Sequence, residues 1–279
     1  MTVVKTNIAA IVANNALRSN QRDLTQAMQQ LATGKKVNSA ADNAAAVSIA
    51  DNMTSYIRGL DQAVRNANDA ISLLQTADGA MVEQSALLQR MREIAVQAAT
   101  DTNSATQRDY LDLEYQALET ELDRIGSQTE WNGSAILDDT GGVASDGVFV
   151  FQVGADASQT FSVSIGDMST GGDLSAIAAG DVDTQANATT AIGNLDTAIA
   201  AVAAQRATIG AGIKRLQHAI ENLTMISQET SASRSQVEDT DYAEATAALA
   251  RAQVIQQAGT AMLAQANQQP SSVLYLLRS

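Results

Sequence analysis

The sequence predicts a mainly α-helical protein: a long antiparallel helical rod, a coiled coil of the two terminal helices, and a small β-hairpin excursion. Apolar residues recur every three or four positions over most of the chain. Only 3% of the 279 residues are aromatic and one is proline, so the apolar content is mainly Ala, Leu, Ile and Val. That composition suits long helices with narrow apolar seams better than a thick globular core.

The two ends of the chain, residues 2–34 and 241–269, each predict a long helix that is rich in Ala and Gln and carries few charges. Each has an apolar seam with the spacing that keeps one face turned toward a partner helix. Asn14 and Gln21 fall on seam positions, where polar groups specify a partner at some cost in stability. We therefore expect both ends to associate, through a self-assembly seam made of Leu17, Leu24, Met28, Leu31, Ala248, Ala252, Ile255, Gly259, Met262 and Ala266.

Three further helices are predicted at about residues 48–100, 105–127 and 185–235, and each has one apolar face. Three long antiparallel helices would bury these faces against one another. Between the second and third of them the periodicity changes to two, which predicts short strands at 148–153 and 160–165 with a turn at 154–159. Gly- and Asp-rich stretches at 138–146 and 166–173 predict surface loops.

Charge and cysteine content exclude several classes of function. The net charge of −14 and the pI near 4.3 leave no basic patch for nucleic acid or an anionic membrane. The chain has no cysteine, so it forms no disulfides and holds no metal through thiolates. No apolar run is long enough to span a membrane, and the first residues do not read as a cleavable signal peptide.

Sites for catalysis, a metal or a cofactor are not expected. His218 is the single histidine, so it cannot supply a second ligand, and a place on a helix surface explains it better. The loop carboxylates between residues 138 and 173 lack the ligand spacing of a calcium loop and are expected to be solvated. Asn132-Gly133-Ser134 matches the N-glycosylation pattern, but so short a motif recurs by chance.

Several segments resemble bacterial flagellins in the same order along the chain. Residues 31–45 (LATGKKVNSAADNAA) are followed by residues 59–60 and 65–72 (RNANDAIS). At the other end, residues 235–243 (SQVEDTDYA) are followed by 251–253, 257–260, 263–268 (LAQANQ) and 276–278. The resemblance covers residues 1 to about 138 and about 185 to 279, with a further patch at 151–155.

The resemblance implies a non-enzymatic subunit that assembles with copies of itself into the extracellular filament of the bacterial flagellum, for swimming motility. It implies an inner coiled-coil domain of residues 1–42 and 239–279, and an outer rod of residues 43–238 with hairpin and loops at 139–180. Implied partners are the flagellar type III export apparatus, which secretes the chain unfolded, an export chaperone binding the C-terminal segment, and hook-associated and cap proteins. No cofactor is implied.

The helical segment 89–97 (QRMREIAVQ) resembles the flagellin segment that the host's flagellin-sensing Toll-like receptor recognises. Gln89, Arg90, Ile94 and Glu114 fall at the matching positions, with Ile94 where many recognised flagellins have Leu. The residues alone predict an exposed helical face on which Arg90 and Glu93 lie within reach of each other.

Two alternatives remain open from the sequence. The first is the hook–filament junction protein of the flagellum, a relative of similar size, although the C-terminal residues fit flagellin itself. The second is an enzyme on a helical scaffold, such as a metalloprotease inserted in a flagellin. No His-Glu-x-x-His motif occurs, which argues against that enzyme.

Overall fold

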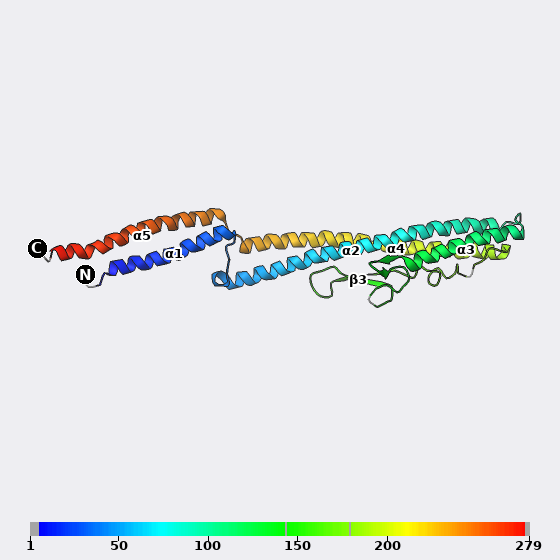
Figure 1. Ribbon diagram of the computed structural model, residues 1–279, viewed down its shortest axis with the longest axis horizontal. Helices are drawn as coiled ribbons and strands as arrows, with labels where there is room; N and C mark the ends of the chain where they lie inside the picture. The colour runs from blue at the N-terminus through cyan, green and yellow to red at the C-terminus, as the bar shows by residue number, and fades with distance from the viewer. Residues whose placement is uncertain (1–5, 143, 179, 277–279) are drawn as a thin grey trace. The chain divides into compact units, whose positions relative to one another are not determined.

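A computed structural model describes residues 6–142, 144–178 and 180–276, with side chains described through residue 268. The predicted mainly α-helical fold is confirmed (Figure 1). The chain forms two compact units, one of Met1–Ser55 with Glu229–Ser279 and one of Tyr56–Gln228. The elements in order are α1 (Ile8–Thr33), α2 (Ala40–Ala98), α3 (Ala105–Gln128), β1 (Glu130–Trp131), β2 (Ser134–Ala135), β3 (Val148–Gln152), β4 (Thr160–Ser164), α4 (Gln185–Glu238) and α5 (Tyr242–Leu276).

The ends of α1 are set by two residues with special backbone chemistry. The side chain of Asn7 accepts a hydrogen bond from the amide of Ala10 at 3.1 Å, which caps the first turn. Gly34 ends the helix with a φ of +72°, the left-handed conformation that glycine adopts without steric cost. The predicted N-terminal helix is therefore present from Ile8, and the part predicted at residues 2–5 lies outside the described residues.

α2 begins earlier than the predicted residue 48, because local polar groups start the helix upstream. Asn43 has an extended backbone, with φ −163° and ψ 99°, and its side chain accepts from the amide of Ala46 at 3.0 Å. It therefore acts as the N-cap of the long helical part that follows. Asp42 accepts from the amides of Asn38 and Ser39, and these bonds lower the pKa of its carboxyl.

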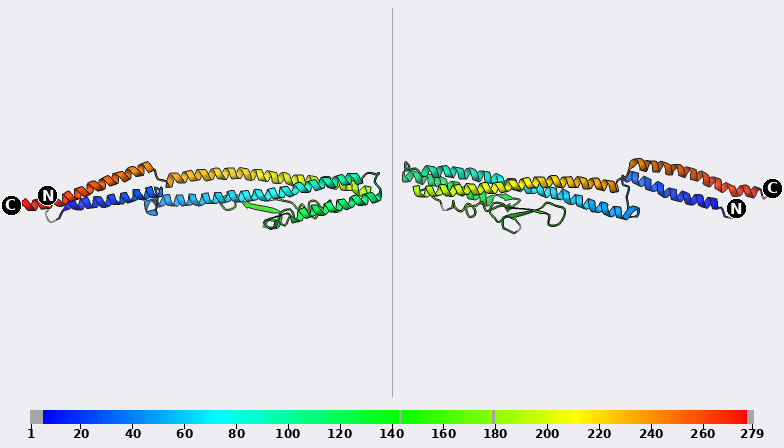
Figure 2. Two further views of the ribbon diagram at one scale, coloured as in Figure 1. Left: turned by 45° about the horizontal axis from the view of Figure 1, so that its top comes forward. Right: turned by 180° about the vertical axis from the view of Figure 1, so that it is seen from behind.

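In the second unit, α2, α3 and α4 pack lengthwise against one another, as predicted (Figures 1 and 2). Polar contacts show that α2 and α4 run antiparallel: Arg92 pairs with Asp196 at 2.6 Å, and Arg206 pairs with Asp78 at 2.8 Å. The core between the helices is continuous and contains mainly aliphatic side chains. Its largest fully buried members include Leu74, Met81, Leu88, Met91, Tyr115 and Leu122.

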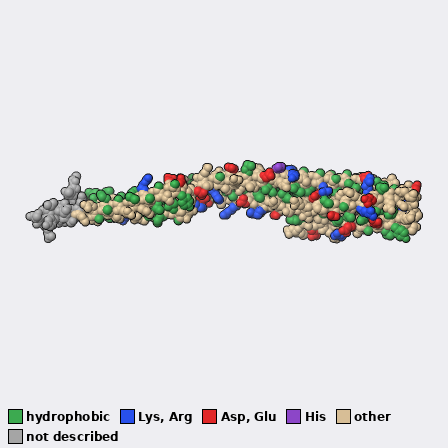
Figure 3. Space-filling view, turned by 90° about the horizontal axis from the view of Figure 1, so that it is seen from above, with side chains coloured by type: hydrophobic (Ala, Val, Ile, Leu, Met, Phe, Trp, Pro, Cys, Tyr) green, Lys and Arg blue, Asp and Glu red, His purple; other side chains and the backbone are tan. Residues whose placement is uncertain are grey.

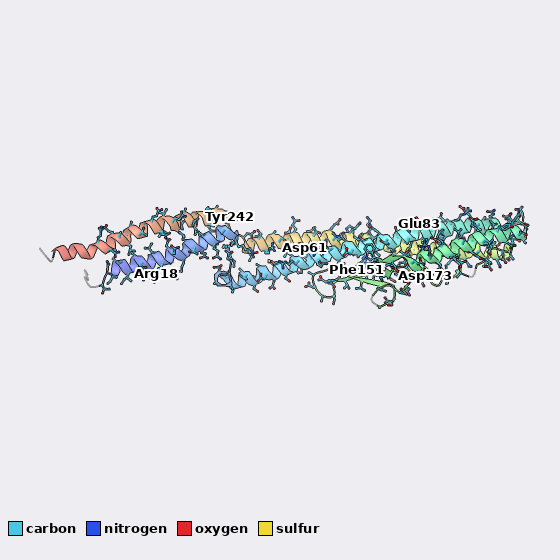
Figure 4. All side chains as sticks on the ribbon, viewed as in Figure 1. Arg18, Asp61, Glu83, Phe151, Asp173 and Tyr242 are labelled. Carbon is cyan, nitrogen blue, oxygen red and sulfur yellow. The ribbon has the colours of Figure 1, made fainter. Side chains whose placement is uncertain are left out.

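The predicted hairpin is present as β3 and β4, antiparallel, with Val148 opposite Ser164 and Phe151 opposite Phe161. Figure 4 labels Phe151 on β3. The hairpin is held by the guanidinium of Arg215, which lies 4.8 Å from the centroid of the Phe161 ring. A second, smaller hairpin of β1 and β2 follows α3 and was not predicted, because its strands have only two residues each.

Candidate functional site

α1 and α5 pair antiparallel along a seam with the coiled-coil repeat (Figures 1 and 2). The positions that are buried or half-buried follow each other at alternating intervals of three and four residues on both helices. On α1 they are Ala10, Ala13, Leu17, Asn20, Leu24, Ala27 and Leu31, and on α5 they are Ala245, Leu249, Ala252, Gln256, Gly259, Leu263 and Ala266. Half of these residues are alanine or glycine, which lets the two backbones lie close together.

Gly259 lies in tight contact with α1 on this seam. A Cβ atom at this position would lie 2.7 Å from Cδ2 of Leu17 and 3.2 Å from its Cγ, closer than carbon atoms normally pack. The contact explains why glycine stands inside a helix, where it costs about 1 kcal/mol relative to alanine. The neighbour of Gly259 is therefore a side chain of the chain's own α1.

Two asparagines tie the helices together across the seam. The side-chain amide of Asn20 donates to the carbonyl of Ala252 at 2.8 Å, and Asn7 donates to the carbonyl of Ala266 at 2.7 Å. Asn20 is the polar residue buried on the seam, whereas Asn14 and Gln21 are exposed. Such a buried amide fixes the register of two helices, because any shift leaves it without its partner.

The predicted seam residues divide between this contact and an outer surface. Leu17, Leu24, Leu31, Ala252, Gly259 and Ala266 lie on the contact face, whereas Met28, Ala248, Ile255 and Met262 are exposed. Six of the ten residues therefore face the chain's own helix pair, and a role of all ten in self-assembly stays a prediction. Apolar side chains lie on more than one face of these helices.

The outer surface forms an open apolar groove along α1 and α5. It encloses about 500 Å³ and is lined by Ala9, Val12, Ala13, Ala16, Leu17, Ile255, Gly259 and Met262. Large apolar side chains are exposed in or near it, with Val12 at 62%, Ile255 at 48% and Met262 at 65%. Figure 3 shows hydrophobic side chains at the surface of these helices, with few charged ones among them. A soluble surface normally keeps such side chains apart or covered.

The segments that follow α1 and precede α5 are clamped to each other. Lys35 and Asp239 form an isolated antiparallel bridge, the amide of Thr240 donates to the carbonyl of Gly34 at 2.9 Å, and Lys35 forms an ion pair with Glu238. Tyr242 begins α5 beside this clamp, as Figure 4 shows. Because the clamp joins the ends of both helices, it sets the position from which their seam begins.

The residues predicted to meet a host receptor lie on α2 and α3. Arg90 pairs with Glu114 of α3 at 2.7 Å and with Glu93 of α2 at 3.0 Å, and these bonds raise the pKa of its guanidinium. Gln89, Arg90 and Glu114 are exposed. Ile94 is only 1% exposed, which corrects its assignment to that surface: it lies on the face of α2 that packs into the core.

Several carboxylates lie near Tyr115 on α3. Burial raises the pKa of the Glu119 carboxyl, and the neighbouring carboxylates of Asp181, Asp123 and Asp112 raise it further. Burial also raises the pKa of the Tyr115 phenol, whose hydroxyl has no hydrogen-bond partner among the described residues. Burial and the nearby carboxylates therefore both favour the protonated forms of Glu119 and Tyr115.

Within the described ranges, His218 and the loop carboxylates do not form a cluster that could hold a metal ion. His218 is exposed on α4, with Nδ1 3.2 Å from Oε2 of Glu221. Within residues 6–142, 144–178 and 180–276, no three His, Asp or Glu side chains are placed to hold a metal ion. A search of the same residues finds no helix with the length and apolar character required to span a membrane.

Comparisons with known proteins agree with one another. Residues 4–141 match the family model of the bacterial flagellin N-terminal helical region, and residues 192–277 match that of the bacterial flagellin C-terminal helical region. A flagellin of Halalkalibacterium halodurans is 38% identical over 276 residues, which is 99% of this chain and 100% of that protein. A flagellin of Bacillus subtilis strain 168 is 39% identical over an alignment of 302 residues, covering 98% of each chain. The crystal structure of Bacillus cereus flagellin has 39% identity and a TM-score of 0.50, over 57% of this chain and 88% of that one.

Proposed function

Because this chain belongs to the bacterial flagellin family, we propose that the outer surface of α1 and α5 joins it to neighbouring copies in the flagellar filament. The chain is a structural subunit of that filament, which lies outside the bacterial cell. The observation that supports the proposed contact is the apolar groove, with Val12, Ile255 and Met262 exposed along it. Nothing in the comparisons favours the junction protein of the hook.

The energetics favour a neighbouring helix as the occupant of this groove. Full burial of a Val, Ile or Met side chain contributes about 1.5–3 kcal/mol. Several such side chains along two helices supply enough to offset part of the entropy lost when a subunit joins the filament. Within α1 only Asn20, Leu24 and Ala27 are buried, so the helix pair has little core of its own. We therefore expect the terminal helices to gain much of their stability on assembly.

A matched pair of methionines tests the proposal. Met262 in the groove and Met225 on α4 are both exposed, at 65% and 63%. Met262→Gln should slow filament growth on seeds and raise the subunit concentration needed for growth, because it places a polar group in the contact. Met225→Gln serves as the control and should grow normally. Sedimentation and electron microscopy would measure both, and equal growth of the two variants would contradict the proposed contact.

We also propose the domain division that the family implies. Residues 1–42 and 239–279 would form the inner coiled-coil domain, and residues 43–238, with 139–180 as hairpin and loops, would form the outer one. The clamp between Lys35 and Asp239 lies close to the proposed boundaries, whereas the two compact units divide further along α2 and α4, after Ser55 and before Glu229.

Further partners are proposed on the same basis. The flagellar type III export apparatus would secrete the chain unfolded, which a chain without disulfides permits. An export chaperone would bind the C-terminal segment and cover the apolar face of α5 before assembly. Hook-associated and cap proteins would contact the ends of the filament. The family is structural, and we propose no catalytic activity or cofactor for this chain.

Recognition by the host's flagellin-sensing Toll-like receptor is proposed for the surface of Gln89, Arg90 and Glu114. The ion pair between Arg90 and Glu114 joins α2 to α3 and presents both side chains at one exposed place. Ile94 would act indirectly, by holding the helix that carries Arg90. A charged pair of this kind gains most when a partner excludes water from it.

A further inference from the structure

The unpredicted hairpin of β1 and β2 contains an asparagine in a reactive setting. Its two-residue loop is Asn132-Gly133, and both residues have positive φ, +51° and +78°, as in a type I′ turn. Both are exposed. Among the described residues, neither the side chain of Asn132 nor the backbone amide of Gly133 has a hydrogen-bond partner, and the space where a Cβ of Gly133 would lie is open.

We propose that Asn132 is a site of spontaneous deamidation and isomerisation. The backbone nitrogen of Gly133 attacks Cγ of Asn132, its proton is lost to solvent, and the side-chain nitrogen leaves as ammonia, which closes a five-membered succinimide. Water then adds to one of the two succinimide carbonyls and opens the ring. The products are an aspartate with the ordinary backbone linkage or an isoaspartate, in which the backbone runs through the former side chain. Only water is consumed, and no oxidant or enzyme takes part.

Two other asparagines in the chain provide internal comparisons, because each precedes a serine. The Asn38 side chain donates to the carbonyl of Lys35 at 2.8 Å, and the amide of Ser39 donates to Asp42 at 3.0 Å. At Asn38 the attacking nitrogen of Ser39 and the side-chain amide both form hydrogen bonds, so a succinimide cannot form without breaking two of them.

Asn103 is held in the same way at the start of α3. Its side chain donates to the carbonyl of Gln97 at 2.6 Å, and the amide of Ser104 donates to Oε1 of Gln107 at 2.8 Å as part of a capping box. Asn132 is the only asparagine followed by glycine in the sequence. The structure thus leaves the most reactive dipeptide free and protects two less reactive ones.

Conversion has a structural consequence beside Asn132. An isoaspartate adds one atom to the backbone of a two-residue loop, so Trp131 can no longer stay opposite Ser134. Trp131 is half-buried and packs against the core of the second unit. It is also the single tryptophan of the chain, so its fluorescence reports on this hairpin alone.

The test is an incubation of the purified full-length protein in mildly alkaline buffer, followed by peptide mass spectrometry that separates aspartate from isoaspartate. We expect Asn132 to convert at least about tenfold faster than Asn38 or Asn103, because glycine leaves its amide unshielded. In concentrated urea the difference in conversion rate should become smaller, because unfolding breaks the hydrogen bonds of the Ser39 and Ser104 amides. Conversion of Asn132 no faster than that of Asn103 in the folded protein would overturn the proposal.

Fluorescence provides the second readout, with Asn132→Asp as the reference. This variant has the new carboxylate but an ordinary backbone, and aspartate tolerates the positive φ of the turn. We expect Trp131 emission to shift to longer wavelength as isoaspartate accumulates and to stay near the starting value in Asn132→Asp. Unchanged emission in protein that contains mostly isoaspartate would contradict the inference that Trp131 loses its place opposite Ser134.

Discussion

Gly259 offers the sharpest test of the seam between α1 and α5, because its contact with Leu17 gives two opposing effects of similar size. Replacing a glycine inside a helix by alanine raises the helix propensity by about 1 kcal/mol. The added Cβ would lie 2.7 Å from Cδ2 of Leu17, so Leu17 must move. Overpacking of this kind costs about 1–3 kcal/mol. Gly259→Ala should therefore change stability by no more than about 1 kcal/mol, since the end of a leucine can rotate away.

Gly259→Leu adds three further carbon atoms beyond the Cβ, next to a contact with Leu17 that the Cβ alone already makes too short. We expect a net loss of about 1–2 kcal/mol per subunit after the gain in helix propensity. Such a loss corresponds to about 5- to 30-fold in an equilibrium constant. The subunit concentration at which seeded filaments stop growing should rise by that factor, as measured by sedimentation, while the unfolding of the second unit by circular dichroism stays unchanged.

The rescue experiment exchanges the two side chains. Leu17→Ala combined with Gly259→Leu moves the large side chain from α1 to α5 and adds only one methyl group to the total volume of the pair. The double variant should grow filaments better than Gly259→Leu alone, and the difference measures the coupling of the two positions. Normal growth of Gly259→Leu, or a double variant that is no better than the single one, would refute the packing of Leu17 on Gly259.

Three further predictions concern single side chains. Asn20→Asp should destabilise the pair of terminal helices by about 2 kcal/mol or more, because it loses the bond to Ala252 and buries a charge, and a lower depolymerisation temperature of filaments would show it. Arg90→Ala should lower activation of the flagellin-sensing receptor in reporter cells by about tenfold, which is about 1.4 kcal/mol of binding, while filament growth is unaffected. Because the pKa of Glu119 is raised in the folded state, the protein has extra stability below the ordinary glutamate pKa of about 4.3 and loses it as pH rises through the raised value. Glu119→Gln should therefore make the free energy of unfolding in urea decrease less between acidic and neutral pH. A pH profile equal to that of the unmodified protein would contradict the raised pKa of Glu119.

Much of the helical architecture was predictable because it depends on local pattern. The period of three to four residues located all five helices, and glycine, asparagine and serine near their ends supply caps that act through neighbouring backbone groups. The alternating stretch located β3 and β4. The hairpin of β1 and β2 was not predicted, since strands of two residues are too short to show a period, although Asn132-Gly133 is itself a turn signal.

The sequence by itself determined the helices, the absence of cysteine chemistry and, through its long motifs, the family. Only the tertiary structure decided which face of each helix is covered. Ile255 and Met262 share the seam spacing with Ala252 and Gly259, yet only Ala252 and Gly259 face α1. The physical reason is that burial depends on the partner's surface as well as on the residue's own polarity. Ile94 shows the same limit, since its place in the core follows from α3 and α4 packing on α2 rather than from its neighbours in sequence.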